Sequence, residues 1–199
     1  MSETQPERPR SAGAPPGQAG GREPATAIVL AGGGSTRMGA RKSLLPFRGK
    51  PLIQHVSQQL SPRFDEILIS ANDPRELSFL NVPVVRDEVP GQGPLRAIIS
   101  CLAVSHHDLN FVIACDIPWV DAALLERLQR ETPGCDCVVP ITDAGHYEPL
   151  FAFYRKSVLP AMRQTIEAGE RRVTAAFSRC RVTTVAILAP CEIVNVNTL

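Results

Sequence analysis

Short apolar runs alternate with amphipathic segments along most of this sequence, and that alternation limits the fold more than any other feature. The apolar runs are rich in β-branched residues and end in glycine or polar residues, as buried parallel strands do. Two of the segments between them open on a proline, Pro51 and Pro94, which favours the first turn of a helix. The alternation predicts an α/β fold: a Rossmann-like, three-layer open sheet, mostly parallel, with helices on both faces.

The expected strands are residues 26–30, 66–71, 82–85, 110–115, 135–142, 149–154, 181–188 and 192–197, and the expected helices are residues 51–60, 94–106, 122–131 and 156–169. Asp121 is the expected N-cap of the third helix. Ligands of open α/β sheets bind beyond the carboxyl ends of the strands. The candidate site therefore consists of the loops after Leu30, Ala71, Val85 and Cys115.

Residues 1–24 are rich in Pro, Gly, Ser and charge, with almost nothing to bury. They are predicted to form a disordered tail, which leaves residues 25–199 as one domain. The 21 basic and 20 acidic residues balance, so neither nucleic acid nor membrane is an expected partner. No stretch approaches the ~20 apolar residues of a membrane span, and a cytoplasmic location is expected. Six cysteines match neither a zinc pattern nor a disulfide framework, and free thiols are predicted.

A glycine-rich loop follows the first expected strand, in the stretch LAGGGSTRMGARKS at residues 30–43. Two of its glycines have P-loop spacing, but Lys42 arrives two residues late for that motif. The loop also fails the dinucleotide fingerprint, because Arg37 holds the place of the third glycine. Backbone N–H groups of consecutive glycines, together with Arg37 and Lys42, still suit a phosphate. We therefore expect a phosphate-binding loop of neither common type.

The longer stretch LAGGGSTRMGARKSLLPFRGKPLI resembles the signature of the nucleotidyltransferases. With RDEVPGQGPL, CDIP, GERRV and NVNT further along, the chain is most similar to the molybdenum cofactor guanylyltransferase (molybdopterin-guanine dinucleotide synthase) family. The resemblance implies the nucleotidyltransferase type of α/β fold and transfer of GMP from GTP to the terminal phosphate of molybdopterin or Mo-molybdopterin. Pyrophosphate is the implied leaving group and Mg²⁺ the implied cofactor. Transient contact with cofactor-inserting proteins or acceptor molybdoenzymes is also implied.

Asp116 ends the expected strand at residues 110–115, where a carboxylate can reach the crevice and hold Mg²⁺; the alternative role is a turn cap. Arg37, Lys42 and Asp116 are the expected catalytic residues. The resemblance assigns nucleotide binding to Leu30, Ala31, Gly32, Gly33, Lys42, Asn72, Asp87, Gly93 and Asp116. It assigns acceptor binding to Arg171, Arg172, Asn195 and Asn197, although paired arginines after a helix are often only a solvated face.

Other functions stay open. A molybdenum cofactor cytidylyltransferase tends to read L-A-A-G and G-D-x-P, where this chain has Gly32 and Cys115, and both residues favour guanine. Another small nucleotidyltransferase, such as a sugar-phosphate enzyme, is a second alternative. A catalytically inactive, nucleotide-binding assembly partner is the alternative from another class. The presence of Arg37, Lys42 and Asp116 together favours an enzyme, because a pure binder does not need the metal carboxylate.

Overall fold

The computed structural model describes residues 22–32, 42–86, 93–189, 191 and 193–196. Its main sheet has seven strands: β1 (Ala25–Leu30), β4 (Glu66–Ser70), β5 (Val84–Val85), β6 (Leu109–Ala114), β7 (Cys137–Ile141), β8 (Phe151–Arg155) and β9 (Val182–Ala186). Their order across the sheet is β5-β4-β1-β6-β8-β7-β9. Only β8 runs antiparallel to its neighbours, β6 and β7, within this sheet. The prediction of a mostly parallel open sheet is confirmed.

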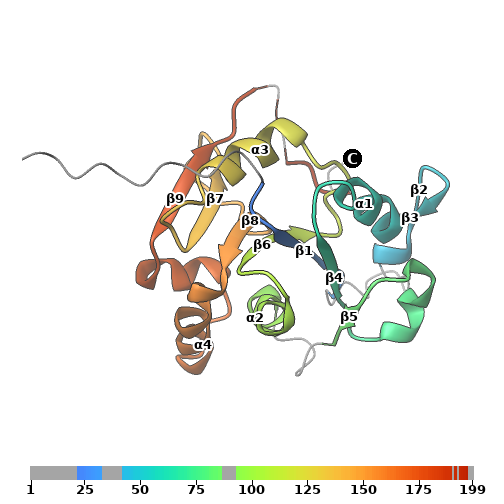
Figure 1. Ribbon diagram of the computed structural model, residues 1–199, viewed down its shortest axis with the longest axis horizontal. Coiled ribbons are helices and arrows are strands. Elements are labelled where there is room, and N and C mark those ends of the chain that lie inside the picture. The colour runs from blue at the N-terminus through green and yellow to red at the C-terminus, as the bar shows by residue number, and fades with distance from the viewer. Residues whose placement is uncertain (1–21, 33–41, 87–92, 190, 192, 197–199) are drawn as a thin grey trace, which may run out of the picture.

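Four α-helices cover the two faces of the sheet in the described part of the chain: α1 (Leu52–Leu60), α2 (Pro94–Val104), α3 (Ala122–Arg130) and α4 (Leu159–Glu167). Figure 1 shows α1 and α3 on one face and α2 and α4 on the other. Each pair buries its own apolar core: Leu52 and Leu124 belong to the first, and Leu95 and Met162 to the second. The structure therefore has the three predicted layers.

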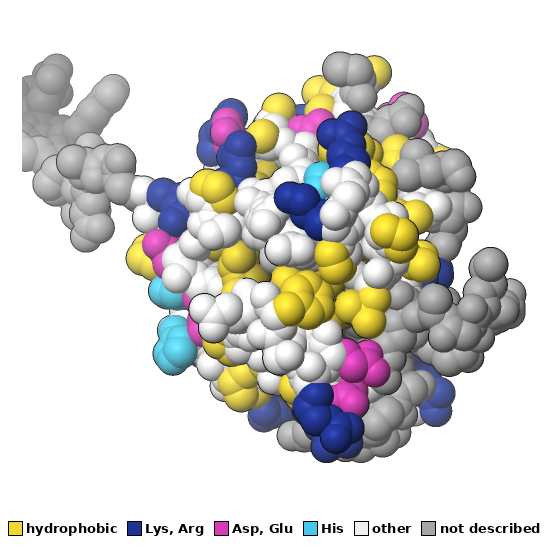
Figure 2. All heavy atoms as spheres, turned by 90° about the vertical axis from the view of Figure 1, so that its right-hand side faces the viewer, with side chains coloured by type: hydrophobic (Ala, Val, Ile, Leu, Met, Phe, Trp, Pro, Cys, Tyr) yellow, Lys and Arg dark blue, Asp and Glu magenta, His cyan; other side chains and the backbone are white. Residues whose placement is uncertain are grey.

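Shorter elements connect these layers. They are a small hairpin of β2 (Pro46–Phe47) and β3 (Lys50–Pro51), and the 3₁₀ segments η1 (Lys42–Leu44), η2 (Pro74–Leu80), η3 (Lys156–Val158) and η4 (Val173–Arg179). The hairpin packs Phe47 against His55 of α1, with ring centroids 4.9 Å apart, and against Trp119 at 5.5 Å. Figure 2 shows this side of the molecule, where hydrophobic side chains are interspersed with basic ones.

Two expectations about elements are wrong in detail. Residues 193–195, within the strand expected at 192–197, form no strand; instead Ile193 and Val196 pack on the core beneath α1 and α3. The helix expected at 156–169 is divided into η3 and α4. All six cysteines are free, as predicted: Cys101, Cys115, Cys135 and Cys137 are buried, and Cys180 and Cys191 are half-buried. No described helix combines the length and apolar character that a membrane crossing requires.

Candidate active site

The carboxyl ends of neighbouring strands are joined by backbone hydrogen bonds just beyond the sheet. The N–H of Cys115 donates to the Leu30 carbonyl at 3.0 Å, and the N–H of Ala31 donates to the Ser70 carbonyl at 2.8 Å. From β1 the chain moves outward to β4 and β5, and then returns to the other side of β1 as β6. The crevice between β1 and β6 is therefore the topological switch point, where ligands of open α/β sheets bind.

Lys42 and Asp116 approach this crevice from distant parts of the sequence. Lys42 opens η1 and Asp116 follows β6 by two residues; both are half-buried. The pKa of the Cys115 thiol is raised to about 12, mainly by burial and also by the Asp116 charge, while the Lys42 charge opposes the rise. The Lys42 ammonium and the Asp116 carboxylate thus both act electrostatically on this thiol at the end of β6. A cation and an anion therefore both act on the same strand end.

Asn72 and Gly93 border the crevice on the side of β4 and α2. The Asn72 Oδ1 atom is buried and has no hydrogen-bond partner among the described residues. A buried acceptor of this kind is costly unless a ligand supplies the donor. Gly93 has φ +83°, a conformation that favours glycine, and α2 begins at the next residue. The first N–H groups of α2 consequently lie at the carboxyl edge of the sheet, where they suit an anion.

The predicted acceptor residues come from two segments of the second half of the chain. A Cβ built on Gly93 would lie 3.9 Å from the Arg171 carbonyl oxygen, so the segment before η4 adjoins the start of α2. Arg172 is exposed and its Nε lies 3.3 Å from Glu170 Oε2, an arrangement compatible with a solvated face. Asn195 precedes Val196, whose N–H donates to the Asp116 carbonyl at 2.8 Å. Arg171 and Asn195 therefore adjoin the crevice through their backbone neighbours.

Leu30, Ala31 and Gly32 follow one another at the end of β1, with Leu30 buried and the other two half-buried. The remaining predicted site residues lie outside the described residues: Gly33, Arg37, Asp87 and Asn197.

Glu148, which the sequence reasoning missed, lies at the same edge of the sheet. It falls between β7 and β8, two residues before Leu150, whose carbonyl accepts a hydrogen bond from the Ala114 N–H at 3.0 Å. Burial raises the pKa of the Glu148 carboxyl, and the nearby charge of His146 opposes the rise. A carboxyl group ahead of a short apolar strand was the only signal in the sequence, and the sequence did not reveal that this strand pairs with β6.

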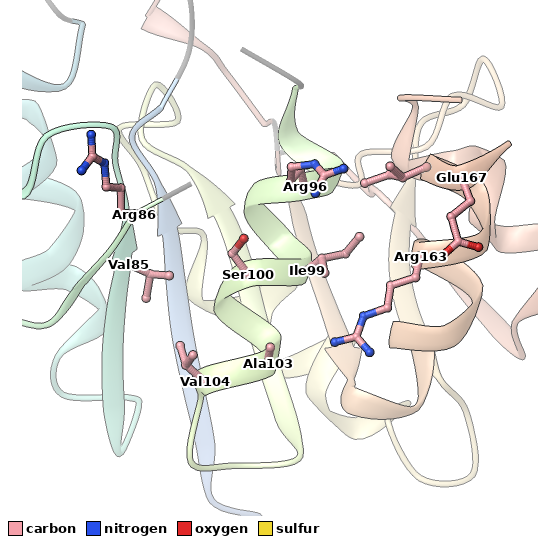
Figure 3. Close-up of a pocket in the computed structure, with 10 residues that line it drawn as sticks. Val85, Arg86, Arg96, Ile99, Ser100, Ala103, Val104, Arg163 and Glu167 are labelled. Carbon is pink, nitrogen blue, oxygen red and sulfur yellow. The ribbon is translucent and has the colours of Figure 1, made fainter. Parts of the chain in front are cut away.

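A hollow of about 390 Å³ lies elsewhere, along the outer face of α2. Figure 3 shows Arg86 on one side of the helix and the guanidinium group of Arg163 on the other. None of the predicted site residues that the structure describes lines the hollow. Because its charged groups do not converge, we do not identify it with the active site.

Among the described residues, no group of three or more His, Cys, Asp or Glu side chains could hold a metal ion. Asp116 nevertheless offers a hard oxygen ligand at the crevice. This fits Mg²⁺, which is commonly bound by one or two carboxylates together with substrate phosphates and water. The geometry suits a metal that arrives with a nucleotide better than a metal enclosed by protein.

Comparison with known proteins places the chain among nucleotidyltransferases. The family described as "MobA-like NTP transferase domain" matches residues 27–182. A "probable molybdenum cofactor guanylyltransferase" of Carboxydothermus hydrogenoformans is 36% identical over 79% of this chain and 79% of its own. A molybdenum cofactor guanylyltransferase of Pseudomonas putida is 37% identical over 79% and 84%. The crystal structure of molybdopterin-guanine dinucleotide biosynthesis protein A from Archaeoglobus fulgidus has a TM-score of 0.68 and 28% identity, covering 81% of this chain and 83% of that one.

Proposed function

Since the chain belongs to the family of MobA-like NTP transferase domains, we propose that it is a molybdenum cofactor guanylyltransferase. It transfers GMP from GTP to the terminal phosphate of molybdopterin or Mo-molybdopterin and releases pyrophosphate. The relatives compared above carry this activity in their names. The observation in the structure that supports the proposal is that the Lys42 and Asp116 charges both act on the Cys115 thiol, which lies at the switch point.

In this reaction the protein mainly has to position the two substrates and stabilise negative charge. A phosphate oxygen of the acceptor is the attacking atom, and it is already ionised near neutral pH, so no side chain has to remove a proton. A new P–O bond forms to the α-phosphorus of GTP while the bond from that phosphorus to the bridging oxygen of pyrophosphate breaks. We assign Arg37 and Lys42 to the negative charge that builds up on the leaving group.

Asp116 is the proposed Mg²⁺ ligand. When bound, Mg²⁺ supplies Lewis-acid stabilisation of the phosphate oxygens. The half-buried Asp116 carboxylate, two residues beyond β6, would hold the ion together with substrate phosphates and water.

The crevice is proposed to bind its two substrates from opposite sides. GTP lies against the nucleotide-binding residues of the first half of the chain, namely Leu30, Ala31, Gly32, Gly33, Asn72, Asp87 and Gly93. Molybdopterin lies against residues of the second half, namely Arg171, Arg172, Asn195 and Asn197. We further propose a cytoplasmic location and a brief contact with the proteins that insert the product or receive it.

The base preference tests this function. We expect GTP to be used at least tenfold better than CTP, because buried polar groups left unpaired by the wrong base cost ~1–3 kcal/mol each. The measurements are a thermal-shift series with GTP, CTP, ATP and UTP in the presence of Mg²⁺, followed by pyrophosphate release in the presence of molybdopterin. Equal use of GTP and CTP would contradict the guanylyl assignment. GTP binding without pyrophosphate release would instead favour the inactive binding partner.

A further inference from the structure

The carboxyl group of Glu148 has no role in the scheme above, yet the chain holds its backbone firmly. The Glu148 N–H donates to the Pro140 carbonyl at 2.9 Å, and the Glu148 carbonyl accepts from the Phe151 N–H at 3.2 Å. The hydroxyl of Tyr154, which is fully buried, donates to the next carbonyl, that of Pro149, at 2.8 Å. Both backbone groups of Glu148 are therefore hydrogen-bonded, and the backbone is held in place on both sides of this residue.

The side chain, in contrast, makes no hydrogen bond or ion pair with any described residue. It is half-buried, and its burial favours the protonated form of the carboxyl group. A partly buried carboxyl group that accepts no hydrogen bond from the described residues loses part of its hydration in the free protein. A ligand that supplies hydrogen-bond donors to this carboxyl group would compensate for the lost hydration. The affinity for that ligand would be higher as a result.

The position of Glu148 decides which ligand this is. Ile113 pairs with Phe151 in the antiparallel β6–β8 ladder, and Ala114 donates to the carbonyl of Leu150. Asp116 and Glu148 therefore leave the same sheet edge from neighbouring strands. One to two strand spacings, roughly 5–10 Å, separate their chain positions across the sheet.

Glu148 also lies on the acceptor side of the crevice. Tyr147, the preceding residue, makes an edge-to-face contact with Phe177 of η4 at 5.5 Å between ring centroids. The segment just before η4 contains the predicted acceptor residues Arg171 and Arg172. Asn72, which borders the nucleotide side, follows β4 and therefore lies beyond β1 in the other direction.

We propose that Glu148 determines specificity for the pterin ring of the acceptor, by accepting two hydrogen bonds from its 2-amino group and the neighbouring ring N–H. This inference rests on the proposed function. A carboxylate has two oxygens with the spacing of such a donor pair, and charge-assisted bonds of this kind are short and strong. Guanine carries the same 2-amino and N–H edge, and the place of Glu148 on the acceptor side assigns it to the pterin.

The variant Glu148→Gln tests the assignment because it preserves shape while turning one acceptor oxygen into a donor NH₂ group. The KM for molybdopterin should rise about tenfold or more, whereas the KM for GTP and kcat should stay near those of the wild type. Asp143→Asn is the matched control, since Asp143 is an exposed carboxylate in the same connection and should leave every parameter unchanged. The melting temperature of each variant confirms that it is folded.

A second measurement compares two ligands in the wild-type protein and in Glu148→Gln. A pterin and the corresponding lumazine, in which oxygen replaces the 2-amino group, are compared as competitive inhibitors against molybdopterin. The wild-type protein should prefer the pterin by about tenfold or more, and Glu148→Gln should abolish that preference. A purely structural Glu148 would not affect this ratio.

Three results would overturn the inference: an unchanged KM for molybdopterin in Glu148→Gln, a raised KM for GTP alone, or no pterin preference in the wild type. The second result would assign Glu148 to the guanine. Failure of the wild-type protein to transfer GMP to molybdopterin is a different outcome, which would contradict the proposed function itself.

Discussion

Lys42 and Asp116 have opposite charges at one strand end, and their proposed roles differ. A lysine that contacts the triphosphate throughout the reaction contributes both to binding and to catalysis. A carboxylate that holds the metal contributes mainly where charge develops on the leaving group. Mutation of the two residues should therefore affect different kinetic constants.

We expect Asp116→Asn to lower Mg²⁺-dependent turnover by ~10²-fold or more while the fold survives, because the change removes a charge and keeps the shape. Lys42→Ala should weaken GTP binding and slow the reaction together. Pyrophosphate release across a Mg²⁺ titration, with circular dichroism to confirm folding, measures both effects.

Lys50→Ala is the control for the lysine, since Lys50 lies in the β2–β3 hairpin, where its ammonium donates to Gln58 on the exposed surface. Near-normal turnover of folded Asp116→Asn at limiting Mg²⁺ would contradict the assignment of Asp116 as the metal ligand. Asp116 would then be only a turn cap.

At the scale of the elements, α3 follows directly from the loop that carries Asp116. Its N-cap is Asp121, as predicted: the Asp121 side chain accepts a hydrogen bond from the Leu124 N–H at 2.8 Å. That bond is the main cause of the lowered pKa of Asp121. The cap therefore helps to fix the loop between β6 and α3.

Asp121→Ala should lower the free energy of unfolding by about 1 kcal/mol, the usual cost of removing such a cap. Because the pKa is lower in the folded state, the stabilisation is present above the ordinary aspartate pKa of about 3.9 and is lost as the pH falls through the folded value. Urea denaturation at pH 7 and at successively lower pH measures the difference. Glu126→Ala, on an exposed part of the same helix, should cost less than ~0.5 kcal/mol; an equal loss would contradict the capping role.

The strands and helices with strong periodicity could be predicted from the sequence, because their burial pattern is local. The antiparallel direction of β8 could not, since it depends on pairing with β6, which lies far away in the chain. Residues 193–196 alternate like a strand but bury Ile193 and Val196 on the core. For the candidate site, strand ends indicated Asp116, whereas Glu148 required knowledge of strand pairing. The set of side chains that meet at one crevice depends on the tertiary fold, so local sequence patterns do not reveal it.

On the scale of the whole molecule, we propose that residues 25–199 form one catalytic domain to which residues 1–24 contribute little. Arg22 and Glu23 nevertheless make ion pairs with the domain: Arg22 with Asp65 at 3.0 Å, and Glu23 with Arg155 at 2.7 Å. The end of the predicted tail is therefore attached to the domain by charged groups.

Deletion of residues 1–21 should leave the melting temperature and turnover within error, because that segment has almost no apolar residues to anchor it. Deletion of residues 1–24 should cost up to about 1 kcal/mol, because both ion pairs are partly exposed and therefore screened. Differential scanning fluorimetry at low and at high salt separates the two truncations. A clear loss in the shorter deletion would show that the tail packs on the domain.

The order of the strands also bears on how the protein is made. β1 pairs with β4 on one side and with β6 on the other, but β6 leaves the ribosome only after β4, β5 and α2. At ordinary rates of translation, one edge of β1 therefore stays open for on the order of ten seconds. An open apolar edge can pair with other chains, so the nascent chain has reason to need a chaperone during that interval. Because Asp116 emerges later still, a nascent chain that has not yet released it cannot bring it to Lys42, and activity can begin only after all the central strands have emerged.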